Sequence, residues 1–278
     1  MATLSAAALL GIATATNAAT TTYVQDGFED AEGFSVGSQV DAHPNWTLGV
    51  PGGTSDTTSG SAIAEANIVN AGLIQSGSQS LQLATTFDGN LFRPDWTRDL
   101  SAANTGTGIA EATVSLGINY NYDNSYSWDQ SVWIYVQSHN LANATPRGRV
   151  AAVRLNSGAG GWGFGANEFK VGNSGSSVRN ADWHDVRLEF DFAAQTVTYY
   201  LDDVLEYVDS LPANTLDPVQ GLTYVFIQNG IHDHGGSDTN VTYIDNVHYS
   251  VTHVPEPASL AVLGMGFMWM LRRRQPAR

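Results

Sequence analysis

The chain of 278 residues contains no cysteine. Disulfide bonds, thiolate catalysis and zinc sites built on cysteine are therefore excluded. A protein without disulfides depends on its hydrophobic core, and a body of more than 200 residues is large enough to bury one. The chain also has no internal repeat and no proline-rich linker. These absences favour a single domain.

Basic residues are scarce as well. Lysine and arginine together number 12, against 27 aspartate and glutamate residues, and the formal net charge is −15. Four of the arginines lie within residues 272–278, so the rest of the chain is still more acidic. Such a surface repels phosphate backbones and excludes nucleic acid as a partner. It is compatible with divalent cations, because these prefer carboxylate and carbonyl ligands.

No apolar run reaches the roughly 20 residues that a membrane-spanning helix usually needs. The first short run, residues 4–13, is followed by the small residues Thr16 and Ala18. This pattern is typical of the second half of a secretory signal peptide, although the positively charged start is missing. We predict a signal peptide over residues 1–19. The alternative is a buried N-terminal helix.

The second apolar run covers residues 258–271 and is followed at once by three arginines. It is shorter than a usual membrane span, and we predict that it forms a short transmembrane helix. A basic cluster favours the cytoplasmic side of a membrane, so the body of the protein is expected on the outside. The two prolines before the run end any preceding helix and leave the backbone between body and membrane accessible.

Residues 254–278 resemble the PEP-CTERM sorting signal, which is also described as the ice-binding protein C-terminal type. The resemblance rests on a short motif, an apolar run and an arginine cluster in fixed order. It implies export from a polysaccharide-producing bacterium, a transient inner-membrane anchor, and release by an exosortase-type peptidase to the cell surface or matrix. A plain C-terminal anchor is the alternative. The residues expected in sorting and processing are Val254, Pro255, Glu256, Pro257, Arg272, Arg273 and Arg274.

Between the two ends, apolar residues recur with period two, which indicates β-strands. The clearest example is the stretch WHDVRLEFD, in which Val186, Leu188 and Phe190 share one face and charged residues share the other. Asp202-Asp203 is predicted to form a turn between two further strands. Similar runs recur up to VTYIDNVHYSV near residue 250. We predict one all-β domain over residues 20–250, an antiparallel jelly-roll sandwich.

The stretches DGFED, GSQSLQL and WHDVRLEFD with its following hairpin are similar to those of concanavalin A-like (laminin-G-like) sandwiches. That resemblance implies a fold shared by lectins and laminarinase-type glucanases. The glucanases carry a carboxylate pair on one strand, and retaining hydrolysis needs the two groups about 5–5.5 Å apart. Glu189 and Asp191 share a face here, but Ala193 stands where the set should be completed. We therefore expect no catalysis.

A structural calcium site is predicted where the first and last strands of the domain meet. Strict alternation places Asp245 on an apolar face, where a carboxylate must be paired, protonated or bound to a cation. Pairing of the terminal strands would bring the acids of DGFED close to it. The rival interpretation is a β-bulge at Asp245-Asn246 that turns a hydrogen-bonded aspartate outward. The expected Ca²⁺ ligands are Asp26, Glu29, Asp245 and Asn246.

Sugar binding needs aromatic rings displayed at the surface. Trp162 and Phe164 stand among glycines, and Trp128 follows a cluster of tyrosine and asparagine. We predict these three as ligand-binding residues, with packing over sheet edges as the alternative. The sequence thus predicts an exported, non-catalytic envelope or matrix protein that binds polysaccharide or another matrix component. A glycan-active hydrolase or lyase of the same fold, and a ligand-free structural surface protein, are the competing hypotheses.

Overall fold

The structure is a computed structural model of the chain. It describes residues 18–48, 56–57, 60–71, 73–89, 91–93, 95–100, 109–120, 130–137, 149–156, 161–165, 170–171, 182–211, 222, 224–232 and 237–253.

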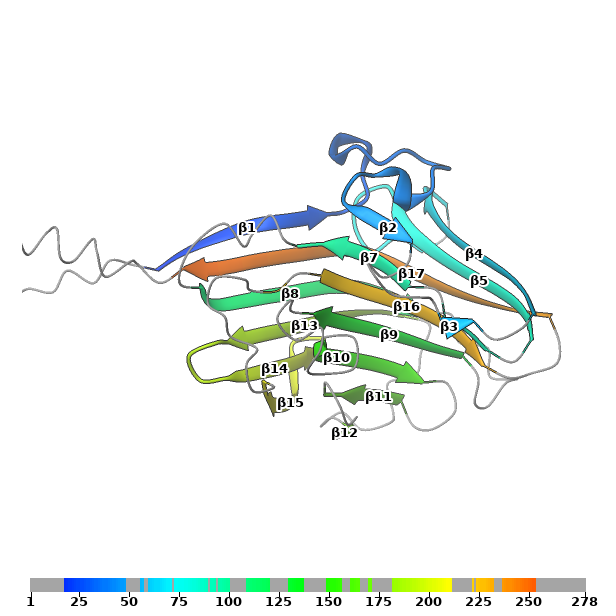
Figure 1. The fold of residues 1–278 in the computed structure, drawn as a ribbon. Coiled ribbons are helices and arrows are strands. Elements are labelled where there is room, and N and C mark those ends of the chain that lie inside the picture. Colours follow the sequence, from blue (N-terminus) through cyan, green and yellow to red (C-terminus); the bar gives the residue numbers. More distant parts are fainter. Residues whose placement is uncertain are drawn as a thin grey trace, which may run out of the picture.

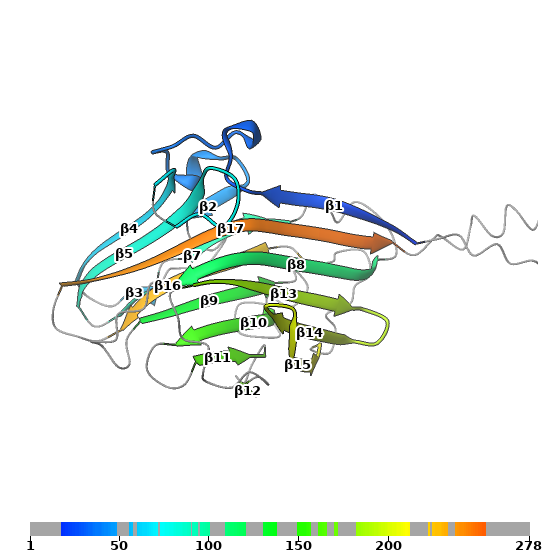
Figure 2. The same cartoon turned by 180° about the vertical axis from the view of Figure 1, so that it is seen from behind.

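Two antiparallel sheets face each other across the described body (Figures 1 and 2). The eight-stranded sheet has the order β15-β14-β13-β8-β17-β5-β4, with β1 paired to β17. Its strands are β1 (Ala19–Asp26), β4 (Gly60–Val69), β5 (Ser80–Gly89), β8 (Ile109–Tyr120), β13 (Trp183–Asp191), β14 (Thr196–Leu201), β15 (Val204–Ser210) and β17 (Ser237–His253).

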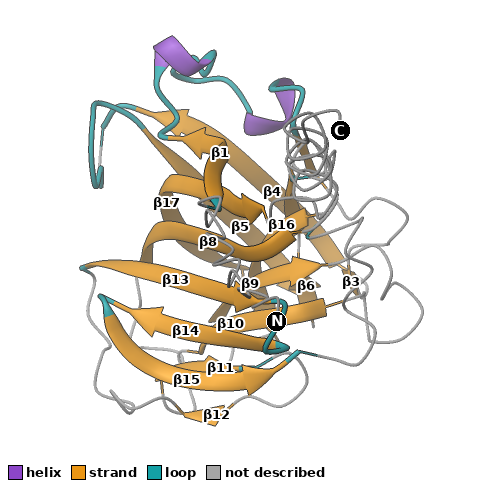
Figure 3. Ribbon diagram, turned by 90° about the vertical axis from the view of Figure 1, so that its left-hand side faces the viewer, coloured by secondary structure: helices purple, strands orange, loops and turns teal. Residues whose placement is uncertain are grey.

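The nine-stranded sheet has the order β12-β11-β10-β9-β16-β6-β3, with β7 paired to β16 and β2 paired to β7. Two short 3-10 helices, η1 (Asp30–Glu32) and η2 (Val40–Ala42), lie at one end of the molecule (Figure 3). The strands of this sheet are β2 (Trp46–Leu48), β3 (Asp56–Thr57), β6 (Leu91–Arg93), β7 (Asp95–Asp99), β9 (Gln130–Gln137), β10 (Arg149–Asn156), β11 (Gly161–Phe164), β12 (Lys170–Val171) and β16 (Tyr224–His232).

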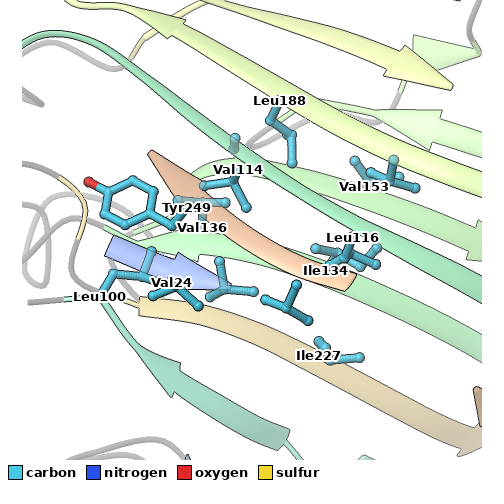
Figure 4. Close-up of a cluster of buried hydrophobic side chains, with 14 of the residues drawn as sticks. Val24, Leu100, Val114, Leu116, Ile134, Val136, Val153, Leu188, Ile227 and Tyr249 are labelled. Carbon is cyan, nitrogen blue, oxygen red and sulfur yellow. The ribbon is translucent and has the colours of Figure 1, made fainter. Parts of the chain in front are cut away.

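The hydrophobic core lies between the sheets and receives side chains from both. Figure 4 shows Val114 and Leu116 of β8 in the same cluster as Ile134 of β9 and Ile227 of β16. Burying one such aliphatic side chain contributes about 1.5–3 kcal/mol. On β13 every second residue is buried, as the period-two pattern predicts. The predicted all-β antiparallel sandwich is confirmed.

The hairpin of β14 and β15 has the two-residue turn expected from the sequence. Asp202 and Asp203 both have positive φ, 51° and 61°. Two consecutive left-handed residues are the geometry of a type I′ turn, which twists in the same sense as the strands it joins. Aspartate tolerates this conformation better than most residues, so the local sequence and the hairpin agree.

A β-bulge interrupts β17 at Asp245 and Asn246. The register to β8 shifts between Asp245 and His248, and Asn246 has a φ of 53°. The extra residue lets Ile244 and Val247, three positions apart, both face the core. Asp245 therefore leaves the inner face that strict alternation assigned to it, and the bulge interpretation is the one that the structure shows.

Strands β1 and β17 bring the two ends of the described body together. Ala19 pairs with His253, and the register runs on to the pair Asp26 and Val247. The sorting-signal residues and the apolar run at 258–271 lie outside the described residues, as does most of the predicted signal peptide. Within the described part of the chain, no helix has the length and apolar character needed to cross a membrane.

Candidate functional site

Asp26, a predicted calcium ligand, forms a buried ion pair at the end of β1. Its Oδ2 accepts a hydrogen bond from Arg98 Nε at 2.5 Å, and its Oδ1 accepts one from Arg98 Nη2 at 3.2 Å. Trp46 Nε1 also donates to Oδ2, at 2.9 Å. Arg98 and Trp46 belong to the nine-stranded sheet, so this cluster ties the two sheets together. Protein donors occupy both carboxylate oxygens of Asp26.

Glu29 holds one end of the loop formed by residues 75–79, which we call the 75–79 loop. Its Oε1 accepts from the backbone N–H of Ser78 at 2.7 Å and of Gln79 at 3.1 Å, and its Oε2 accepts from Ser78 Oγ at 2.6 Å. Gly77 has a φ of 68°, and a Cβ there would lie 2.2 Å from Glu29 Oε1. The positive φ therefore favours glycine at this position.

Asp245 holds the other end of the same loop. The side chain is fully buried, and it accepts three backbone hydrogen bonds: from Gln75 at 3.2 Å, from Ser76 at 3.0 Å and from Asn246 at 2.8 Å. Ser76 Oγ donates to Asn246 Oδ1 at 2.8 Å. Glu29, Asp245 and Asn246 are thus brought together around the 75–79 loop, whereas Asp26 is engaged elsewhere.

The predicted calcium site stays a prediction. Among the described residues, no group of three or more histidine, aspartate or glutamate side chains is arranged to hold a metal ion. Backbone N–H groups bind the buried carboxylate of Asp245 in the place expected for a cation. The sequence carried no signal for this, because every residue except proline offers the same backbone donor.

The two carboxylates of the 75–79 loop have pKa values shifted in opposite directions. The hydroxyl and the N–H of Ser78 are the main causes that hold the pKa of Glu29 below its ordinary value of 4.5. Burial raises the pKa of Asp245 above 3.8, although the N–H groups of Ser76, Asn246 and Gln75 oppose this. Ionisation of Glu29 therefore stabilises the folded state relative to the unfolded chain, whereas ionisation of Asp245 does not.

Replacing Glu29 with glutamine is expected to remove an acid-sensitive part of the stability. Because its folded pKa is lowered, Glu29 stabilises the protein above pH 4.5, and this contribution is lost as the pH falls through the folded value. In thermal melts, the wild type should have the higher melting temperature at neutral pH, and its difference from Glu29→Gln should shrink as the pH is lowered. Asp30→Asn, an exposed neighbour, serves as control. A constant difference between wild type and Glu29→Gln across this range would contradict the prediction.

An aromatic pair lies on the outer face of the nine-stranded sheet. Val132, Ile134 and Val136 of β9 face the core, so Trp133 and Tyr135 point the other way. Their ring centroids are 5.4 Å apart at an interplanar angle of 44°. Tyr135 is buried, whereas Trp133 is half-buried. This face therefore presents one partly accessible aromatic ring.

Arg154 of β10 completes this face. It is the cross-strand partner of Trp133, and its guanidinium carbon lies 4.7 Å from the centroid of the tryptophan ring. This is a cation–π contact, worth about 0.5–1 kcal/mol at a partly exposed site. We call Trp133, Tyr135 and Arg154 the aromatic face. It combines a fixed ring with a fixed hydrogen-bond donor.

The ligand-binding residues predicted from the sequence do not form this face. Phe164 is fully buried and its ring lies 5.7 Å from that of Tyr199, so the prediction that it is displayed to sugars is wrong. The reason is its register: it pairs with Val153, an inward-facing residue of β10. Trp162 lies in β11, but its side chain, like Trp128 as a whole, is outside the described residues. The alternation in SVWIYVQS, which set Trp133 apart from the core residues, was the signal that could have found it.

The acids weighed for catalysis have structural partners. Glu189 is ion-paired with Arg187 of the same strand. Asp191 Oδ1 accepts a hydrogen bond from the backbone N–H of Ala194 at 2.7 Å, which closes the turn between β13 and β14. Asp191 therefore acts as a turn residue of the kind that aspartate commonly provides.

Comparison of the sequence with protein-family models found no match, and comparison with curated protein sequences found none either. Among solved structures, the cellulose-induced protein Cip1 aligns with a TM-score of 0.50 and 11% identity, over 82% of this chain and 96% of its own. Peanut lectin, solved with a nine-residue peptide, aligns with a TM-score of 0.50 and 9% identity, over 86% of this chain and 100% of its own.

A sialidase aligns less well, with a TM-score of 0.46 and 11% identity. The alignment covers 77% of this chain but only 18% of the sialidase's length. At such identities the likeness to solved structures shows the fold alone. The antiparallel sandwich expected from the resemblance to concanavalin A-like proteins is therefore shared with a lectin.

Proposed function

We propose that the protein is an exported, non-catalytic β-sandwich that binds polysaccharide at the aromatic face. The observation that carries this proposal is the half-buried ring of Trp133, held in place by Arg154 and Tyr135 on the outside of a broad sheet. The names of two proteins with a similar fold, a lectin and a cellulose-induced protein, support a glycan as the ligand.

Sugar binding at this face follows from the chemistry of the three residues. The apolar C–H face of a pyranose packs on an aromatic ring, while hydroxyl groups need nearby polar partners that fix the orientation. Trp133 supplies the ring, and the guanidinium of Arg154 supplies N–H donors. Because the cross-strand partner already orients the ring, less conformational entropy is lost on binding.

The structural roles of Glu189 and Asp191 support the non-catalytic part of the proposal. An acid held by an arginine and an acid that closes a turn do not form the pair that retaining hydrolysis needs. In this proposal the protein holds a glycan and leaves its bonds intact.

Export and release belong to the same proposal and rest on the resemblance of residues 254–278 to the PEP-CTERM signal. A transient membrane anchor and an exosortase-type peptidase acting at Pro255-Glu256-Pro257 would deliver the body to the cell surface or matrix. Ala19 pairs with His253, so both terminal segments join the body at the same end. Processing there leaves the aromatic face on the sheet intact.

The test is affinity electrophoresis of the full chain in gels that contain laminarin, xylan, galactomannan or alginate. We expect at least one polysaccharide to retard the wild type, and Trp133→Ala to bind at least about tenfold more weakly, since central aromatic contacts contribute about 1.4 kcal/mol or more. Tyr243→Ala, a half-buried aromatic of the other sheet, is the matched control and should bind as the wild type does.

Two outcomes would contradict the proposal. Release of reducing ends or unsaturated products from the retarding polysaccharide would make the protein an enzyme of the same fold. Unchanged mobility in every gel would favour a ligand-free structural protein.

A further inference from the structure

A polar hollow of about 210 Å³ lies on the outer face of the eight-stranded sheet. Leu116 of β8 and Val186 of β13 face the core, so the alternate residues of these strands form the floor and walls of the hollow. The aromatic face lies on the outside of the other sheet, so the two regions are on opposite sides of the sandwich. The polar lining consists of Ser115, Gly117, Asp185, Arg187, Asp203 and Asn246.

A glycine and a bulge lie at the rim of the hollow. Gly117 has no side chain, and the amide of Gln75 occupies the space above it: a Cβ on Gly117 would lie 1.7 Å from Gln75 Oε1. Gln75 Nε2 donates to Asp185 Oδ1 at 2.6 Å, and Asn246 Nδ2 donates to Gln75 Oε1 at 3.1 Å. The bulge of β17 leaves Asn246 exposed. The 75–79 loop thus fixes the polar groups on this side.

Arg187 fixes the opposite side. Its guanidinium carbon lies 3.9 Å from the centroid of the Tyr200 ring, and Nη2 donates to Asp203 Oδ1 at 3.1 Å. Nη1 donates to Glu189. The cation is therefore neutralised by two carboxylates, and Asp185 adds a third negative charge to the surroundings. An anionic ligand is disfavoured in such a field.

The lining suits a neutral ligand rich in hydroxyl groups. A hydroxyl group both donates and accepts, and the hollow offers carboxylate acceptors beside guanidinium and amide donors, all already oriented by protein contacts. Its volume is below the roughly 300 Å³ at which pockets for drug-sized ligands begin, so it suits one ring rather than a chain.

We propose that this hollow is a second glycan site, which takes a single neutral sugar ring such as a chain end or a branch. It is independent of the aromatic face, because no residue is shared and the two sheets separate them. A molecule with both sites bridges two glycan chains, whereas the aromatic face alone only attaches to one.

The experiment is ligand-observed saturation-transfer NMR on the full chain. The probes are the methyl α-glycosides of glucose, galactose, mannose and N-acetylglucosamine at millimolar concentrations. We expect at least one glycoside to bind, and Ser115→Leu, which fills the hollow, to weaken that binding at least about tenfold. Thr113→Leu is the matched control, because it lies two residues earlier on the same face of β8 and outside the lining.

A second variant guards against misfolding. Asp203→Asn keeps a side chain that tolerates the left-handed turn and removes one charged acceptor, so we expect a binding loss of several-fold with an unchanged melting temperature. The inference is overturned if no glycoside binds, or if Ser115→Leu and Thr113→Leu have the same effect. If Trp133→Ala abolishes glycoside binding and Ser115→Leu does not, only the aromatic face binds sugar. That result would overturn this inference and leave the proposed function standing.

Discussion

Arg98→Ala is expected to destabilise the protein by about 3–5 kcal/mol, because it leaves the buried carboxylate of Asp26 without its cation. The side chains of Arg98 and Asp26 are only 7% and 8% exposed, so water cannot replace the lost partner. For a body of this size the melting temperature should fall by roughly 6–20 °C. Urea denaturation would measure the change in the free energy of unfolding. Tryptophan fluorescence is a suitable signal, because Trp46 donates to the same carboxylate.

A double replacement separates the cost of an unpaired charge from the value of the ion pair. Replacing both Asp26 and Arg98 with apolar residues of similar volume should cost less than Arg98→Ala alone, since no buried charge is then left without a partner. Asp203→Asn is the surface comparison: Asp203 pairs with Arg187 but its side chain is 92% exposed, and we expect a change within about 0.5 kcal/mol. A double variant as unstable as the sum of the single variants would contradict this account.

Asp245→Ala is expected to cost about 2–4 kcal/mol, because three backbone N–H groups lose a charged acceptor at once. Asp245→Asn keeps one oxygen acceptor and should cost less. Burial raises the pKa of Asp245, so the folded protein binds the proton more tightly than the unfolded chain does. The stability of the wild type relative to Asp245→Asn should therefore decrease as the pH rises from about 3.8 through the folded pKa.

Calcium distinguishes the two accounts of Asp245. A cation held by this carboxylate would raise the melting temperature of the wild type and not that of Asp245→Ala. A carboxylate held by N–H groups leaves the two proteins with the same response to calcium, and this is the result we expect. A calcium-dependent rise confined to the wild type would support the predicted calcium site.

The sandwich could be predicted because its signals are local. In β13 the alternation of Val186, Leu188 and Phe190 with charged residues determines which face enters the core. Asp202-Asp203 determines a tight turn in the same way. The bulge at Asp245-Asn246 could be offered only as one of two alternatives, because alternation alone does not show where an extra residue is inserted.

The candidate sites depended on contacts between residues far apart in the chain. Phe164 was misplaced because its neighbouring glycines suggested exposure, whereas the register of β11 against β10 buries it. The pairing of Trp133 with Arg154 also follows from a register, that of β9 against β10. Strand register is decided by the packing of whole sheets, so short sequence windows do not contain it.

By itself the sequence determined an acidic, cysteine-free β-sandwich, with alternating apolar and polar residues in its clearest strands. The folded arrangement alone decided that Asp26 is neutralised by Arg98, that Asp245 is bound by the 75–79 loop, and that Gly117 lies beneath the amide of Gln75. Polarity is a property of each side chain and can be read along the chain. The partner of a buried charge is set by which strands are neighbours, and a backbone N–H donor leaves no mark in the sequence.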